Sequence, residues 1–191
     1  MNEQKPRLGF AMTGSFCTHG AALGVLGKLT GEYGIVPILS EHAAAWDTRF
    51  GKAEDLVRAV KELTGRDPVT AVTEAERFGP SYPLDALLIC PCTGNTLAKM
   101  AQGITDTAVT MAAKAHLRSD RPLLIALASN DAMSANLENI GTLLNRKNVF
   151  FVPMRQDDPV KKPHSLVADF ASVPSALTAM TRGEQLRPLF L

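Results

Sequence analysis

The sequence has few cysteines, no long hydrophobic run and almost no net charge. Its three cysteines lack the paired spacing of a zinc site, and their odd number does not suit a disulfide framework. The distinct apolar runs have four to seven residues, too few for a membrane span or for the apolar core of a signal peptide. Twenty basic residues balance 19 acidic ones. We therefore expect a cytoplasmic protein with reduced thiols, and no metal, membrane or nucleic-acid partner.

Short apolar runs alternate with helix-patterned stretches along the whole chain. Most of the runs are continuously apolar, which is typical of strands covered on both faces of a parallel sheet. The length and ordinary composition suit one domain over residues 1–191. The pattern predicts an α/β protein with a Rossmann-like, three-layer α/β/α fold and a mostly parallel six-stranded sheet. The predicted strands are 8–12, 35–39, 69–72, 84–90, 123–128 and 149–152, and the predicted helices are 18–30, 53–63, 96–102, 106–117 and 135–144.

Polar residues follow the first two predicted strands, at the edge where open parallel sheets bind ligands. Gly14 allows a ligand close to the backbone, and Ser15 is placed to cap a helix whose free N–H groups face an anion. Ser40 is a candidate for contact with a phosphate or a sugar hydroxyl. His42 is a candidate base with a near-neutral pKa. The alternative interpretation is a plain capped turn followed by a solvated histidine.

The third turn carries the strongest local signal. Thr93, Asn95 and Thr96 follow the most apolar run and precede an amphipathic helix. Capping the free N–H groups of that helix needs only one such side chain, and here there are three. This favours a bound anion or a polar ring over capping alone.

Two further segments are rich in charge. Arg49 lies close to Trp46, where an exposed pair would bind a ring or a carboxylate. Lys161, Lys162 and His164 lie in a proline-bounded loop after the last predicted strand. We expect the arginine and the lysines to contact an anionic substrate, and His164 to be a second candidate base. The alternatives are a Trp46 that packs on the core and a solvated connecting loop.

The segment PCTGNTLAKMAQGITDT (91–107) resembles the PASANT segment of the flavin-binding decarboxylases and flavin prenyltransferases. Pro91, Asn95 and Thr96 match it, and Asn130 corresponds to the asparagine of that family's PAMN segment. The resemblance covers nearly the whole chain and implies the flavoprotein fold, homo-oligomers and an FMN site. The cofactor-binding residues that it implies are Gly14, Ser15, Ser40, Thr93, Asn95, Thr96 and Asn130.

The chain also departs from the decarboxylase pattern. Cys92, Thr93 and Gly94 replace alanine, serine and alanine of the PASANT segment. A His-Ile-Glu-like segment and a cysteine-bearing substrate flap are both missing. Decarboxylation of a cysteinyl substrate is therefore not expected.

Segments 40–51 and 156–170 are similar to those of the B subunits of dipicolinate synthases. That resemblance implies a dehydrogenase-like A subunit as partner, with NAD(P) on that subunit. It also implies joint oxidation of 4-hydroxy-tetrahydrodipicolinate, a small dicarboxylate, to dipicolinate in the mother cell of a sporulating bacterium. Two alternatives remain at this point: an FMN-dependent decarboxylase or prenyltransferase that acts alone, and a non-catalytic scaffold or activator of the A subunit.

Overall fold

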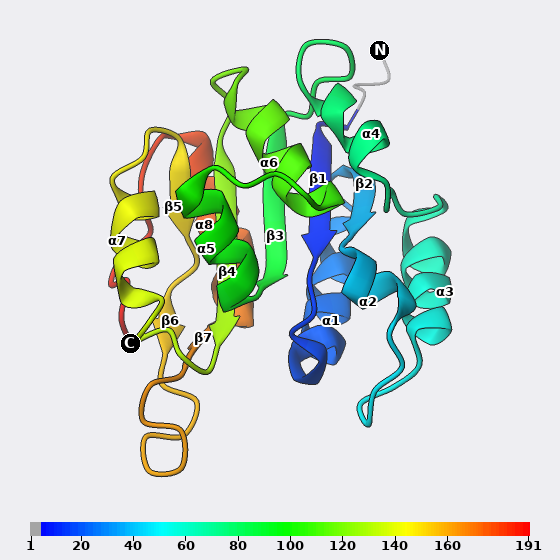
Figure 1. Ribbon diagram of the computed structural model, residues 1–191. Coiled ribbons are helices and arrows are strands. Elements are labelled where there is room, and N and C mark those ends of the chain that lie inside the picture. Colours follow the sequence, from blue (N-terminus) through cyan, green and yellow to red (C-terminus); the bar gives the residue numbers. More distant parts are fainter. Residues whose placement is uncertain (1–4) are drawn as a thin grey trace.

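A mostly parallel sheet forms the centre of the molecule. The computed structural model describes residues 5–191, so residues 1–4 of the predicted domain lie outside the described residues. Neighbouring strands follow the order β2-β1-β3-β4 and run in the same direction (Figure 1). Their bounds are β1 (Arg7–Met12), β2 (Gly34–Leu39), β3 (Ala86–Cys92) and β4 (Leu123–Ser129). The chain reverses its direction of winding between β1 and β3, which is where such sheets form ligand crevices.

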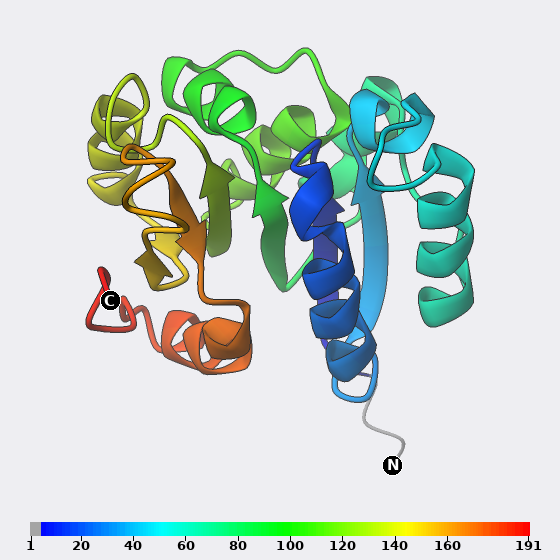
Figure 2. The same ribbon diagram turned by 90° about the horizontal axis from the view of Figure 1, so that it is seen from below.

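Helices cover both faces of the sheet, as the three-layer prediction requires (Figure 2). One layer has α1 (His19–Leu29), α3 (Ala53–Thr64) and α8 (Val173–Thr181), and the other has α5 (Gly94–Gln102), α6 (Ala108–Leu117) and α7 (Leu137–Leu144). The short elements are α2 (Glu41–Ala45), α4 (Val72–Ala75), η1 (Phe16–Thr18), η2 (Glu76–Phe78) and η3 (Phe170–Ser172). Within the described chain, no helix combines the length and the apolar character that a membrane crossing needs.

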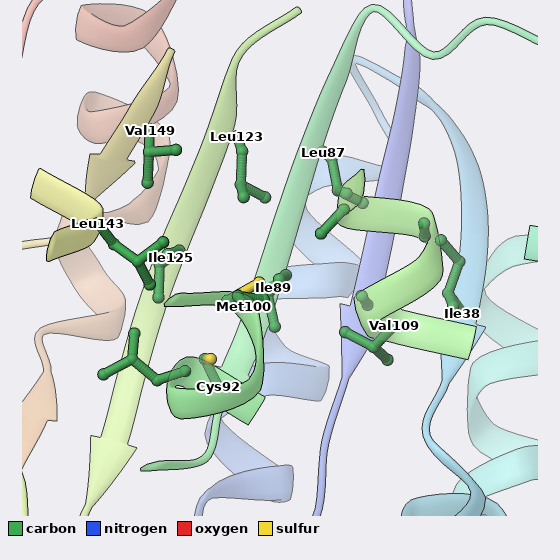
Figure 3. Packing of buried hydrophobic residues seen from close by; sticks show 14 of the residues in the cluster. Ile38, Leu87, Ile89, Cys92, Met100, Val109, Leu123, Ile125, Leu143 and Val149 are labelled. Atoms are coloured by element: carbon green, nitrogen blue, oxygen red, sulfur yellow. The ribbon is translucent and has the colours of Figure 1, made fainter. Parts of the chain in front are cut away.

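The two helix layers bury alternate residues of the same strands. In β3, Leu87 and Ile89 belong to the core beneath α5, α6 and α7 (Figure 3), whereas Leu88 and Cys90 face the other layer. All seven residues of β3 are buried. Side chains alternate between the faces of a strand, so a strand covered on both faces must be apolar throughout. This confirms the interpretation of the continuous apolar runs.

The predicted number of strands is wrong: the sheet formed by residues 5–191 has seven strands. Run 69–72 is not one of them, because Val69 makes a single bridge to Ile38 and Val72 begins α4. The last three strands extend the sheet beyond β4, and two of them pair directly with β4. They are β5 (Val149–Phe151), which is parallel to it, β6 (Met154–Arg155) and β7 (Leu166–Ala168), and the β4–β7 and β6–β7 pairs are antiparallel. The charged loop after β6 reverses the direction of the chain. The strands on either side of it have only two or three residues, which is too few to show a hydrophobic period in the sequence.

Candidate functional site

The turns that follow β1 and β3 are joined through one buried threonine. Thr13 is only 1% exposed. Its Oγ1 donates a hydrogen bond of 2.9 Å to the carbonyl oxygen of Pro91 and accepts one of 2.9 Å from the N–H of Thr93. The backbone N–H of Thr13 also donates to Pro91, at 3.1 Å. The segments 13–15 and 93–96 therefore form one continuous wall at the carboxyl edge of the sheet.

Two hollows open on either side of this wall. The larger has about 540 Å³ and reaches the ends of β4 and the charged loop 156–165, and the smaller has about 260 Å³ and reaches α2. Gly14, Phe16, Thr93 and Asn95 line both. The larger hollow falls within the roughly 300–1,000 Å³ of sites that hold cofactors and other small molecules.

All seven predicted cofactor-binding residues line one or both hollows. Ser15 and Asn130 line the larger one, and Ser40 and Thr96 line the smaller one. The remaining three, Gly14, Thr93 and Asn95, lie on the wall between them.

The polar side chains of this set divide into two groups. The Ser40 hydroxyl caps α2 by accepting a 3.3 Å hydrogen bond from the N–H of Ala43. The Thr93 hydroxyl caps α5 by accepting one of 3.2 Å from the N–H of Thr96. By contrast, the exposed amides of Asn95 and Asn130 make no hydrogen bond to other residues in the range 5–191. The two amides and the N-terminus of α5 therefore remain as donors for a ligand, and so does the O–H of Ser40, which only accepts in its cap.

The two candidate bases lie in different places. His42 lines the smaller hollow, and its ring lies 4.0 Å from that of Trp46, centroid to centroid. Trp46 is 56% exposed, so it does not pack into the core. His164 is exposed and outside both linings, and its carbonyl oxygen accepts a hydrogen bond from the N–H of Met133. Only His42 has the position of a base that faces a bound ligand.

The predicted cationic residues divide in the same way. Lys162 lines the larger hollow and forms an ion pair with Asp157, and this hydrogen bond raises the pKa of Lys162. Lys161 and Arg49 are exposed and outside both linings, and the Arg49 guanidinium lies over the ring of Phe50. Because Asp131 and Asp157 also line the larger hollow, its side chains carry no net positive charge.

Several charged or titratable groups at or beside the site were not predicted from the sequence, among them Lys99, Asp106 and, just outside both linings, His19. His19 Nε2 lies 2.8 Å from the carbonyl oxygen of Thr13, and burial lowers the pKa of His19 although this hydrogen bond opposes the shift. Lys99 and Asp106 line the smaller hollow and form an ion pair at 2.8 Å, and the hydrogen bond from Lys99 lowers the pKa of Asp106. Their positions inside a helix and in an ordinary loop carry no local signal.

Gly94 explains one departure from the PASANT pattern. A Cβ atom at this position would lie within 3 Å of side-chain atoms of Ser129, Asp131 and Asn136. Ser129 donates a hydrogen bond to Asp131, and Asn136 Nδ2 donates one of 2.9 Å to the other carboxylate oxygen. The missing side chain thus lets a polar network reach the start of α5. The glycine in place of alanine was the sequence signal for this contact.

Comparisons with known proteins give the family of the chain. The model of the Flavoprotein family matches residues 1–175. The chain is 38% identical to the B subunit of dipicolinate synthase from Bacillus subtilis (strain 168) over 186 residues, which are 97% of this chain and 93% of the relative.

Solved structures extend the comparison. The crystal structure of the dipicolinate synthase B subunit from Bacillus halodurans C matches with a TM-score of 0.90 and 36% identity, covering 100% of this chain and 98% of that one. The FMN-dependent cysteine decarboxylase SpaF matches with a TM-score of 0.70 and 27% identity, covering 93% and 97%. The chain therefore belongs to the flavoprotein family, in which it is a homologue of the dipicolinate synthase B subunits.

Proposed function

We propose that this chain, as one domain, is the B subunit of a dipicolinate-forming enzyme in the cytoplasm of a sporulating mother cell. It acts with a dehydrogenase-like A subunit that holds NAD(P), and it assembles as a homo-oligomer. The observation that carries the proposal is the 38% identity over 97% of the chain. The substrate is 4-hydroxy-tetrahydrodipicolinate.

The larger hollow suits a planar ligand that is rich in acceptors. The free amides of Asn95 and Asn130 are donors, and Gly14 contributes to the lining without a side chain of its own. The N-terminus of α5 adds partial positive charge without an ionised side chain. These groups fit FMN, which the related SpaF requires. When bound, a flavin supplies a hydride acceptor.

Aromatisation of the substrate removes one water molecule, one hydride and one proton. The hydride acceptor would be the nicotinamide held by the A subunit, or a flavin if the larger hollow holds one. We assign proton acceptance to His42, because its ring faces the smaller hollow and Trp46 restricts its orientation. If the A subunit's nicotinamide is the acceptor and the larger hollow holds no flavin, Asn95 and the N–H groups of α5 donate hydrogen bonds to the carboxylates of the substrate, since Lys162 is already paired with Asp157.

The test is reconstitution of dipicolinate formation, followed by ultraviolet absorbance, with and without the A subunit, NAD(P) and FMN. We expect turnover only when both subunits are present. The variant Asn95→Ala should weaken ligand binding about tenfold, which is what one lost hydrogen bond to a charged group costs. Asn145→Ala removes an exposed amide at the end of α7 and is the matched control.

The outcome also separates the rival functions. Carbon dioxide release by this chain alone with FMN would favour a decarboxylase, the function that the likeness to SpaF suggests. Full activity of complexes that carry Ser15→Ala and Asn95→Ala would instead indicate a scaffold or activator. Either result would overturn the proposal.

A further inference from the structure

Three arginines converge on one tyrosine at the amino edge of the sheet, the edge opposite the candidate site. The Cζ atoms of Arg7 and Arg77 lie 4.8 and 5.4 Å from the centroid of the Tyr82 ring. Arg66 Nη1 donates a 3.4 Å hydrogen bond to the hydroxyl of Tyr82. We call these three arginines and Tyr82 the arginine cluster. They come from β1, from the segment after α3, from η2 and from the loop before β3.

The positive charge of the cluster is not neutralised within residues 5–191. None of its three guanidinium groups lies within 4.0 Å of a carboxylate oxygen in that range. The nearby Asp85 is already engaged: one oxygen accepts from the backbone N–H of Arg7 at 2.8 Å, and the other pairs with Arg121 at 3.0 Å. Like charges held around one ring repel each other, and an added anion would relieve that repulsion.

The shape of this surface favours side chains of another protein over a small molecule. The hollows beside the cluster have about 230 and 280 Å³, and neither is lined by more than one of the three arginines, so a small anion in either hollow would meet only one of them. Lys5 lines both, Arg7 lines one and Arg66 lines the other. Such shallow hollows fit single carboxylate side chains.

The charge pattern also distinguishes a protein from a nucleic acid. Exposed carboxylates, among them Asp85 and Glu76, interrupt the basic surface, and the whole chain carries a net charge of only +1. A nucleic acid needs an uninterrupted basic track along its phosphates. Guanidinium groups, by contrast, bind single carboxylates through two parallel hydrogen bonds.

We propose that the arginine cluster is the docking surface for an acidic segment of a partner protein, whose Glu or Asp side chains pair with Arg7, Arg66 and Arg77. A partner bound at this edge leaves both hollows at the carboxyl edge open. The docking surface therefore acts independently of the chemistry proposed above.

The test uses fluorescein-labelled hexaglutamate as the probe, titrated with the full chain at low salt and followed by fluorescence anisotropy. The triple variant R7Q/R66Q/R77Q should bind the probe at least tenfold more weakly. The triple variant K28Q/K114Q/R187Q, which changes the same charge at exposed positions on α1, on α6 and near the C-terminus, should bind as the parent does. Equal weakening in both would overturn the proposal, because net charge alone would then explain binding.

Two further arms close the alternatives. If a fluorescent thymidylate hexamer binds more tightly than hexaglutamate, the surface is a nucleic-acid site. If millimolar orthophosphate displaces the probe, the surface is a small-anion site. Either result overturns the proposal. Urea unfolding shows whether the triple variant folds. If the triple variant does not fold, the test uses the single variant R66Q, which removes one hydrogen bond to Tyr82. We expect R66Q to bind the probe threefold more weakly, and unchanged binding would contradict the proposal.

Discussion

The two edges of the sheet have a common element and opposite electrostatics. At each edge a histidine Nε2 lies 2.8 Å from a backbone carbonyl oxygen, His19 from Thr13 at the carboxyl edge and His116 from Pro122 at the amino edge. Around the first, the charged side chains that line the hollows are largely paired and the free donors are amides. The second lies at the edge that carries the arginine cluster.

The direction of the helices accounts for this difference. In a parallel α/β fold the helix N-termini gather at the carboxyl edge and the C-termini at the amino edge. The positive end of a helix dipole stabilises an anionic ligand without ionised side chains, whereas the negative end stabilises cations. One edge is thereby suited to a small ligand and the other to cationic side chains.

The largest effect is expected at Gly94, where the carboxyl edge is most tightly packed. Gly94→Ala should lower the free energy of unfolding by about 1–3 kcal/mol, because the new methyl group overlaps atoms of Ser129, Asp131 and Asn136. It should also weaken ligand binding. Gly24→Ala on α1 is the control: its Cβ would meet nothing within 4 Å, so stability should stay equal or rise. Equal urea midpoints for the two variants would show that Ser129, Asp131 and Asn136 can move aside without loss of stability.

Thr13 is the next test, because it joins the two turns of the carboxyl edge. Thr13→Val should cost about 1–2 kcal/mol of unfolding free energy, since the buried N–H of Thr93 loses its acceptor. Thr13→Ser keeps the hydroxyl and should retain most of the stability and the ligand affinity. Parallel urea titrations of both variants measure the difference, and a serine variant as unstable as the valine variant would show that keeping the hydroxyl does not preserve the link between the two turns.

Acidification tests the histidine at the amino edge. Burial lowers the pKa of His116 below its ordinary value of 6.5, so the folded chain holds this ring neutral. As the pH falls below 6.5, His116 becomes protonated in the unfolded chain but stays neutral in the folded chain. Stability is therefore complete above that pH and declines below it, by at most about 1.4 kcal/mol per pH unit for this one proton.

The variants separate the contribution of His116 from that of other groups. His116→Gln should flatten the decline in urea midpoint between pH 6.5 and pH 5, and His164→Gln, at an exposed position, should leave it unchanged. Part of the decline should persist in His116→Gln, because burial also lowers the pKa of His19. An unchanged decline would show that His116 is not its source.

The smallest effect is expected for the ion pair of Lys99 and Asp106. Asp106→Asn should change the free energy of unfolding by at most about 1 kcal/mol, because exposed pairs gain little in water. Asp67→Asn, which breaks an exposed pair with Lys61, is the control. A tenfold loss of ligand affinity in Asp106→Asn alone would mean that paired charges take part in the carboxyl-edge site, and would revise the contrast between the edges.

Local patterns predicted the strands that are buried on both faces, because such strands must be apolar throughout. The polar residues of the turns after β1, β2 and β3 were also predicted, since the parallel fold places them at a single edge. Run 69–72 was predicted wrongly, because four apolar or threonine residues suffice for a strand pattern but not for a ladder. The residues that β6 and β7 need for pairing lie on either side of a ten-residue loop, 156–165, which no local window spans.

By itself, the sequence determined the layered α/β architecture and the edge at which the candidate site lies, since both follow from the order of apolar runs and polar turns. Only the tertiary structure decided which side chains are free there: the Thr93 hydroxyl both caps α5 and donates to the Thr96 hydroxyl, whereas the Asn95 amide stays available. It also brought Arg7, Arg66 and Arg77 around one ring. Such juxtapositions depend on distances between segments remote in the chain, which hydrophobic periodicity does not encode.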